Sequence, residues 1–143
     1  MQHKYLHYLL LGFILLEIIL TANLAFNADA GAFCLTGSDC DSVQNSSYGK
    51  LFGIKLGVFG FVMFTLLLVL FLYTEKYPHH HHFLLLAIAL GFCFSVYFLF
   101  VQFFILQKVC SSCFIIDALA ILLFIVALFW SRSLRKEWHK IIE

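Results

Sequence analysis

The sequence predicts an all-α membrane protein, a bundle of four membrane-spanning helices. Of its 143 residues, 63% are hydrophobic and only 12% are charged, whereas about a quarter of the residues in an ordinary soluble domain are charged. The apolar residues gather in four long runs, and about 20 such residues cross the hydrocarbon layer of a membrane. Because backbone groups cannot stay unpaired in lipid and no run alternates like a barrel strand, we expect four helices.

The expected helices cover about residues 8–28, 51–73, 83–106 and 109–130, with a polar loop at 29–50. They leave no room for a soluble domain, so we expect residues 1–143 to form a single membrane domain. The net charge of +1 provides no basic surface for nucleic acid. Lys4 and Ala28-Asp29-Ala30 loosely imitate a cleavable signal peptide, but the apolar run between them exceeds a signal core.

The basic residues predict the orientation in the membrane. One side would carry Lys4, Lys76, Arg132, Arg135, Lys136 and Lys140, and the other Lys50, Lys55 and Lys108. Since basic residues concentrate on the cytoplasmic side, we expect both termini in the cytoplasm and the loop at 29–50 facing outward. That outer side, a periplasm or an equivalent exterior, is oxidising and permits disulfides.

Two cysteine pairs would lie on this outer side. Cys110 and Cys113 form a C-x-x-C motif at the start of the last helix, and Cys34 and Cys40 lie in the loop. Cysteines three apart share a helix face, and a helix N-terminus favours a thiolate. A zinc site and structural disulfides stay open as alternatives. A disulfide within one helical turn stabilises little, so redox exchange is favoured and no metal is expected. Cys93, in mid-helix, is expected to be a buried small apolar residue.

An ordered set of motifs connects the two pairs. Cys40 is followed directly by DSVQNSSYGKLFGI, and Tyr97, Gln102 and Phe104 precede Cys110 and Cys113. Over roughly residues 8–130, this order resembles the loop and the second, third and fourth helices of the vitamin K epoxide reductase family.

The resemblance implies a four-helix bundle around a quinone pocket, in which cysteines relay electrons. Cys34 would accept electrons from a thioredoxin-like partner, and Cys40 would pass them on through a transient disulfide with Cys110. Cys113 would be the thiolate that meets the quinone, and Ser46 would help to hold the outer segment over the pocket. Because quinones are stronger oxidants than most dithiols, the protein would generate disulfides.

Two departures from the family pattern bear on the substrate. The run at 51–73 lacks the Asn with which the animal enzymes bind the quinone oxygen, and Asp117 stands where they tend to have a Tyr. Both favour a respiratory quinone such as ubiquinone or menaquinone over vitamin K epoxide. The chain also ends soon after the fourth helix, so we expect a separate thioredoxin-like partner outside the cytoplasm rather than a fused domain.

Two acidic residues lie within the expected helices. Asp117, four residues after Cys113, is a candidate proton donor or hydrogen-bond partner for the quinone, or alternatively pairs with a neighbouring helix. Glu17 is expected to be neutral and hydrogen-bonded to a polar group such as Gln102 or Ser95, with a proton path as the alternative.

Two other classes of function stay open. A metal-handling membrane protein would carry copper or zinc on its cysteines or on His79–His82, although a solvated turn after Pro78 is favoured for the histidines. A disulfide-stapled membrane scaffold would perform no catalysis. Thiol:quinone oxidoreduction accounts for both cysteine pairs and is the preferred hypothesis.

Overall fold

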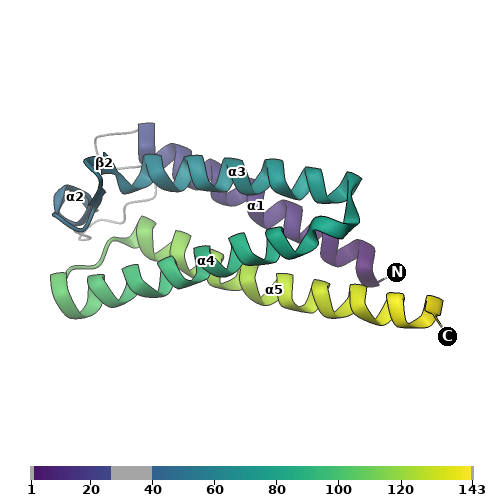
Figure 1. The fold of residues 1–143 in the computed structure, drawn as a ribbon. Helices are drawn as coiled ribbons and strands as arrows, with labels where there is room; N and C mark the ends of the chain where they lie inside the picture. Colours follow the sequence, from purple (N-terminus) through teal and green to yellow (C-terminus); the bar gives the residue numbers. More distant parts are fainter. Residues whose placement is uncertain (1, 27–39, 143) are drawn as a thin grey trace.

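Four long helices make up most of the protein (Figure 1). The computed structural model describes residues 2–26 and 40–142. The helices are α1 (Gln2–Phe26), α3 (Leu56–Lys76), α4 (His81–Phe100) and α5 (Ser111–Ile142). All four are long and apolar enough to cross a membrane, which confirms the predicted fold class.

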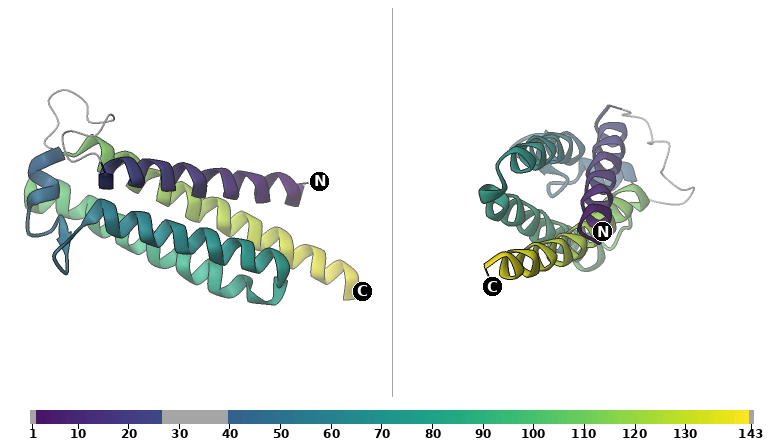
Figure 2. Two further views of the ribbon diagram at one scale, coloured as in Figure 1. Left: turned by 90° about the horizontal axis from the view of Figure 1, so that it is seen from above. Right: turned by 90° about the vertical axis from the view of Figure 1, so that its right-hand side faces the viewer.

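The helices form a ring, as the end-on view in Figure 2 shows. Helix α1 packs mainly on α3 and α5, and α4 packs mainly on the same two helices. The central core consists of Leu10, Ile14, Leu67, Phe71, Leu84, Ile88, Leu123, Ala127 and Trp130. Other large apolar side chains, such as Leu66, Phe83 and Phe129, are exposed on the outer surface. Such a surface suits contact with lipid.

The loop and the second helix differ in detail from the sequence prediction. Helix α3 begins at Leu56, because the preceding residues form an antiparallel hairpin of β1 (Lys50–Leu51) and β2 (Ile54–Lys55). Its two-residue turn requires positive φ at both central positions, and Phe52 and Gly53 adopt 53° and 81°. The described part of the loop also contains a short helix, α2 (Cys40–Asn45).

The connections between the later helices are short. A 3₁₀ turn, η1 (Pro78–His80), joins α3 to α4. Helix α4 continues into a π-helical segment, η2 (Val101–Leu106), which ends where Gln107 adopts the left-handed conformation with φ 50°. The chain then reverses and reaches α5 within a few residues.

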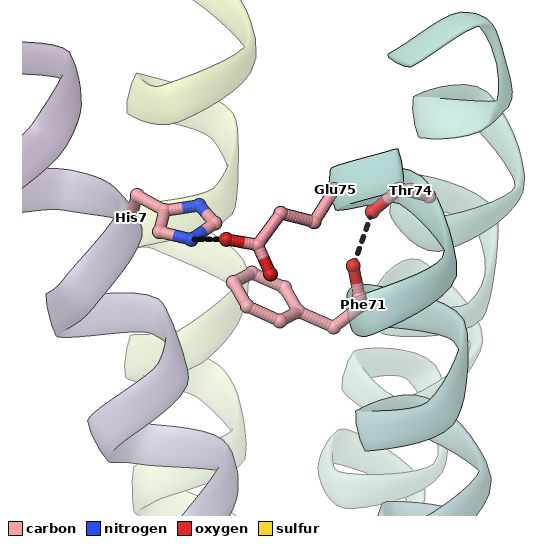
Figure 3. A network of polar contacts seen from close by, with 4 residues as sticks. All are labelled: His7, Phe71, Thr74 and Glu75. Atoms are coloured by element: carbon pink, nitrogen blue, oxygen red, sulfur yellow. Dashed lines mark hydrogen bonds and ion pairs between the residues drawn. The ribbon is translucent and has the colours of Figure 1, made fainter. Parts of the chain in front are cut away.

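The two ends of the bundle carry different segments. We call the end with α2, the hairpin and the start of α5 the cysteine end, because Cys40 and Cys110 cluster there. The end with both termini and η1 is the terminal end (Figure 1). At the terminal end, His7 of α1 forms an ion pair of 3.3 Å with Glu75 of α3 and stacks on Phe71 (Figure 3). The hydroxyl group of Thr74 donates to the carbonyl oxygen of Phe71.

Candidate functional site

Three of the four expected site cysteines lie together at the cysteine end. Cys40, Cys110 and Cys113 form a buried cluster with Leu24 and Val43. Cys40 begins α2, and its sulfur lies 4.0 Å from the hydroxyl oxygen of Ser111 in the first turn of α5. The fourth cysteine, Cys34, lies outside the described residues.

The cysteines are in different redox states. Cys40 is disulfide-bonded, with its partner outside the described residues, whereas Cys110 and Cys113 carry free thiols. The oxidised Cys40 therefore lies next to Ser111, which stands between the two reduced cysteines in the sequence.

Cys110 caps the N-terminus of α5. Its carbonyl oxygen accepts the N–H of Phe114 at 2.9 Å, and its sulfur accepts the N–H of Cys113 at 3.3 Å. A side chain in this position meets N–H groups that have no partner within the helix, at the positive end of the helix dipole.

This environment favours the thiolate of Cys110, which immediately precedes the apolar span Ser111–Lys136. The pKa of Cys110 is lowered, chiefly because the Cys113 thiol donates a hydrogen bond to its sulfur. Burial opposes the shift, and the backbone N–H groups of Ser112 and Cys113 reinforce it. The N-terminus of α5 thus favours a thiolate at Cys110, and the thiolate at Cys113 that would meet a quinone stays a prediction.

An apolar cavity of about 200 Å³ lies next to Cys113. Four polar side chains line it, namely Cys113 and Asp117 of α5, Ser95 of α4 and Thr21 of α1. The remaining wall is mostly apolar and comes largely from α3 and α4. Several wall residues, including Met63 and Leu90, are also exposed on the outer surface. The cavity therefore reaches the lipid-facing side between α3 and α4.

Asp117 is held by polar groups from the third membrane span. The side-chain amide of Gln102 donates to its carboxyl group at 3.4 Å, and the hydroxyl group of Ser95 donates to it as well. The amide oxygen of Gln102 accepts the backbone N–H of Cys110 at 3.2 Å. Gln102 thus connects the helix cap at Cys110 to the carboxyl group that lines the cavity.

Ser46 fixes the turn that follows α2. Its hydroxyl group donates to the carbonyl oxygen of Val43 at 2.6 Å and accepts the N–H of Gly49 at 3.0 Å. A Cβ atom on Gly49 would meet the carbonyl oxygens of Val43 and Gln44. The turn therefore requires glycine, and together with Ser46 it supports the helix that carries Cys40.

The chain matches one protein family over most of its length. The model of the Vitamin K epoxide reductase family matches residues 5–128. The chain belongs to this family. Comparison with curated proteins and with solved structures gave no match. The vitamin K epoxide reductase family comprises membrane proteins that couple thiols to quinones, so this member is an integral membrane oxidoreductase.

The prediction that Cys93 is buried is wrong. Its side chain is exposed on the outer surface of α4, whose buried positions are Leu84, Ile88 and Ser95. At about 100° per residue, a position nine residues after Leu84 points to the opposite side of the helix. Cys93 therefore faces away from the core and from the other cysteines.

The hydrogen bonds expected for Glu17 are also absent. Its side chain is buried, but neither carboxyl oxygen has a hydrogen-bond partner among the described residues. Gln102 and Ser95, the partners that we expected for Glu17, bind Asp117 instead. The sequence did not predict that Gln102 would bind Asp117 and Cys110. A polar residue seven positions after Ser95, on the same helix face, was the signal for its role.

The histidines lie at the terminal end of the bundle. His79 and His80 belong to η1, and His81 and His82 begin α4. Within residues 2–26 and 40–142, no group of three or more His, Cys, Asp or Glu side chains is arranged to hold a metal ion.

Proposed function

We propose that the protein is a thiol:quinone oxidoreductase that generates disulfide bonds. Electrons would pass from a thioredoxin-like partner through Cys34 and Cys40 to Cys110 and Cys113, and from there to a membrane quinone. The observation that carries this proposal is that Cys113 and Asp117 line one apolar cavity, while Cys40 lies against the first turn of α5.

The cavity suits a quinone ring. Its wall is mostly apolar, as an aromatic ring and a lipid tail require, and its few polar groups offer hydrogen bonds to ring oxygens. Because the cavity reaches the lipid-facing side between α3 and α4, a quinone can enter from the bilayer. A bound quinone would accept two electrons and two protons. Ubiquinone, menaquinone or a related respiratory quinone is the proposed acceptor.

The cysteines pass two electrons in each exchange. A thiolate attacks a disulfide sulfur, so one S–S bond forms as another breaks. Cys34 would exchange with the partner, and Cys40 would exchange with Cys110. The observed combination of an oxidised Cys40 and free thiols at Cys110 and Cys113 corresponds to the state after this transfer and before quinone reduction.

The last step would join Cys110 to Cys113 in a disulfide. Each sulfur loses one electron, and the quinone gains both. Cys113 and Asp117 both line the cavity, whereas Cys110 does not. Cys113 would therefore be the sulfur that meets the ring, and Asp117 would supply a proton from the same wall. Gln102 binds both Asp117 and the backbone N–H of Cys110, and so fixes their relative positions. A preorganised proton donor stabilises the charge that develops on the quinone oxygen.

The proposed orientation places the cysteine end on the oxidising side of the membrane and the terminal end in the cytoplasm. The excess of basic residues near the termini and η1 supports this arrangement. The partner would be a separate thioredoxin-like protein in the periplasm or an equivalent exterior, and residues 1–143 would act as one membrane domain.

Quinone reduction by the purified protein tests the proposal. In lipid nanodiscs with a reduced thioredoxin-like protein and a soluble ubiquinone or menaquinone analogue, we expect one quinol for each partner disulfide formed. Cys113→Ala should reduce the rate to the uncatalysed background, and Cys93→Ala should match the wild type. Quinol formation by Cys113→Ala, or no quinol formation by the wild type, would contradict the proposal.

A trapping experiment tests the electron path. Combining Cys34→Ser with Cys113→Ala removes the sulfurs that would resolve the transfer. A disulfide formed between Cys40 and Cys110 with an added two-electron oxidant such as diamide should therefore persist. Non-reducing mass spectrometry of the digested protein should find this disulfide. The same variant with Cys110→Ser in addition provides the control. A predominant link from Cys40 to Cys93 would show that the proposed path is wrong.

A further inference from the structure

Glu17 is a buried carboxylic acid whose role the electron path does not explain. It lies midway along α1, and its side chain has 0% exposure. Neither carboxyl oxygen has a hydrogen-bond partner among the described residues. The hydroxyl group of Thr21 donates to the backbone carbonyl of Glu17, at 2.6 Å, rather than to its carboxyl group. Burying such a group costs free energy, and acids inside membrane helices are commonly functional.

Glu17 interacts with the acid that lines the cavity but does not line the cavity itself. Helix α1 packs on α5, and the carboxyl groups of Glu17 and Asp117 interact electrostatically. Asp117 and Thr21 line the cavity, whereas Glu17 does not. Asp117 also interacts electrostatically with Cys110. Asp117 thus interacts both with the cysteine pair and with the buried acid of the neighbouring helix.

The proposed reaction leaves one proton to be stored. The helix cap, where the Cys110 sulfur accepts the N–H of Cys113, favours Cys110 as the thiolate. With Cys113 as the thiol, the reduced pair then carries one proton fewer than a full dithiol. When an incoming dithiol reduces the Cys110–Cys113 disulfide, one of its two protons stays on the pair and the other is released. When the pair reduces a quinone, Cys113 supplies one of the two protons that the quinol needs. The second proton must come from an acid at the site.

We propose that Glu17 is the reservoir for this second proton and refills Asp117 after Asp117 has protonated the quinone. The inference rests on the proposed function. Asp117 gives its proton to the quinone oxygen and takes another from Glu17. When the next dithiol reloads the cysteine pair, the proton that it releases passes through Asp117 to Glu17, so protons and electrons balance over the cycle. Because Glu17 does not line the cavity, it acts through Asp117.

The test compares Glu17→Gln with the wild type in nanodiscs. Glutamine has the shape of a neutral glutamic acid but cannot transfer the proton. We expect kcat for quinone reduction to fall roughly 10- to 100-fold, with KM unchanged, a larger solvent deuterium isotope effect and a shifted pH profile. Thiol exchange between Cys40 and Cys110 should keep its rate. Glu17→Asp should restore part of the activity, because it restores a transferable proton.

A double variant distinguishes a relay from a structural role. In the Asp117→Asn background, Glu17→Gln should add no further loss, because the two acids act in series. Equal losses of thiol exchange and quinone reduction in Glu17→Gln would indicate a structural role and overturn the inference. An unchanged kcat and pH profile would overturn it as well. A wild type that reduces no quinone would instead overturn the proposed function, and this inference with it.

A spectroscopic measurement covers the case in which Glu17→Gln does not fold. Infrared difference spectra between the oxidised and reduced wild type should contain a band from a protonated carboxyl group, and Glu17→Asp should shift that band. A spectrum in which Glu17→Asp shifts no carboxyl band would show that Glu17 does not change its protonation, and the relay would be excluded.

Discussion

Both ends of the bundle place polar side chains next to a cavity, but the two sites differ in their access to water. At the terminal end, His7 and Glu75 line a pocket of about 340 Å³, and their side chains are 18% and 56% exposed. At the cysteine end, Cys110, Cys113 and Asp117 are between 0% and 8% exposed. Water can replace a lost partner at the terminal end, whereas the buried groups at the cysteine end depend on one another.

This difference in exposure determines how much the loss of a polar partner costs at each end. An exposed ion pair is worth up to about 1 kcal/mol and is weakened by salt. A buried group that loses its partner costs about 1–3 kcal/mol, because nothing else satisfies it. Substitutions at the cysteine end should therefore have large effects on quinone reduction, and matched substitutions at the terminal end should have small ones.

The largest effect is expected for Asp117→Asn. The amide cannot give up a proton to the quinone, so quinone reduction should slow by about 100-fold or more. Exchange between Cys40 and Cys110 should continue, since it does not use the cavity. Stopped-flow measurement of quinol formation checks the first expectation, and thiol trapping checks the second. Glu75→Gln at the terminal end is the control, and unchanged quinol formation in Asp117→Asn would refute the role of this acid.

Removal of the Gln102 side chain should have the next largest effect. Gln102→Ala leaves the N–H of Cys110 and one oxygen of Asp117 without this partner, at a cost of about 1–3 kcal/mol. We expect about tenfold slower quinone reduction and a lower unfolding temperature in nanodiscs. Gln107→Gly removes an exposed amide at a position with positive φ, which glycine accepts. Similar results for both variants would contradict the bridging role.

Gly49→Ala should act on stability more than on chemistry. Its Cβ atom would meet the carbonyl oxygens of Val43 and Gln44, and such overpacking typically costs about 1–3 kcal/mol. Displacement of α2 should also slow the exchange between Cys40 and Cys110. Thermal unfolding and disulfide trapping measure the two effects. At Gly12 nothing lies within 4 Å of an added Cβ atom, so Gly12→Ala should be neutral or slightly stabilising. An equal loss of stability in both variants would contradict the steric explanation for Gly49.

The smallest effect is expected at the terminal end. His7→Gln should lower stability by less than about 1 kcal/mol, because its ion pair with Glu75 is partly exposed. Quinone reduction should stay at the wild-type rate. Unfolding of the variant at low and high salt measures the first point, and the quinol assay measures the second. A tenfold loss of quinone reduction in this variant would show that the two ends are coupled.

The helices were predictable because their signal is local. Runs of apolar residues long enough to cross a membrane identified all four spans. The contacts were less predictable, because they depend on how each helix is rotated. Cys93 and Ser95 are two residues apart in the same apolar run, yet one faces outward and the other binds Asp117.

The segments near the loop show a second limit. The apolar run from residue 51 onward resembles a helix, but the Phe52-Gly53 turn pairs its first residues into a hairpin. Likewise, the cysteine spacing placed Cys110 and Cys113 on one helical face. The structure instead places Cys110 before the helix, where its sulfur accepts the N–H of Cys113. Such details depend on the backbone conformation at helix ends, where sequence patterns are weakest.

The cap at Cys110 bears on the reduction potentials of the two cysteine pairs. Its thiolate is stabilised by the N-terminus of α5 and by Cys113 only while the pair is reduced. Oxidation consumes the charge that the helix end favours. A dithiol whose reduced form is stabilised has a higher potential and is a stronger oxidant. On the proposed electron path, the first turn of α5 would therefore favour transfer of electrons from the loop cysteines to the pair at the membrane.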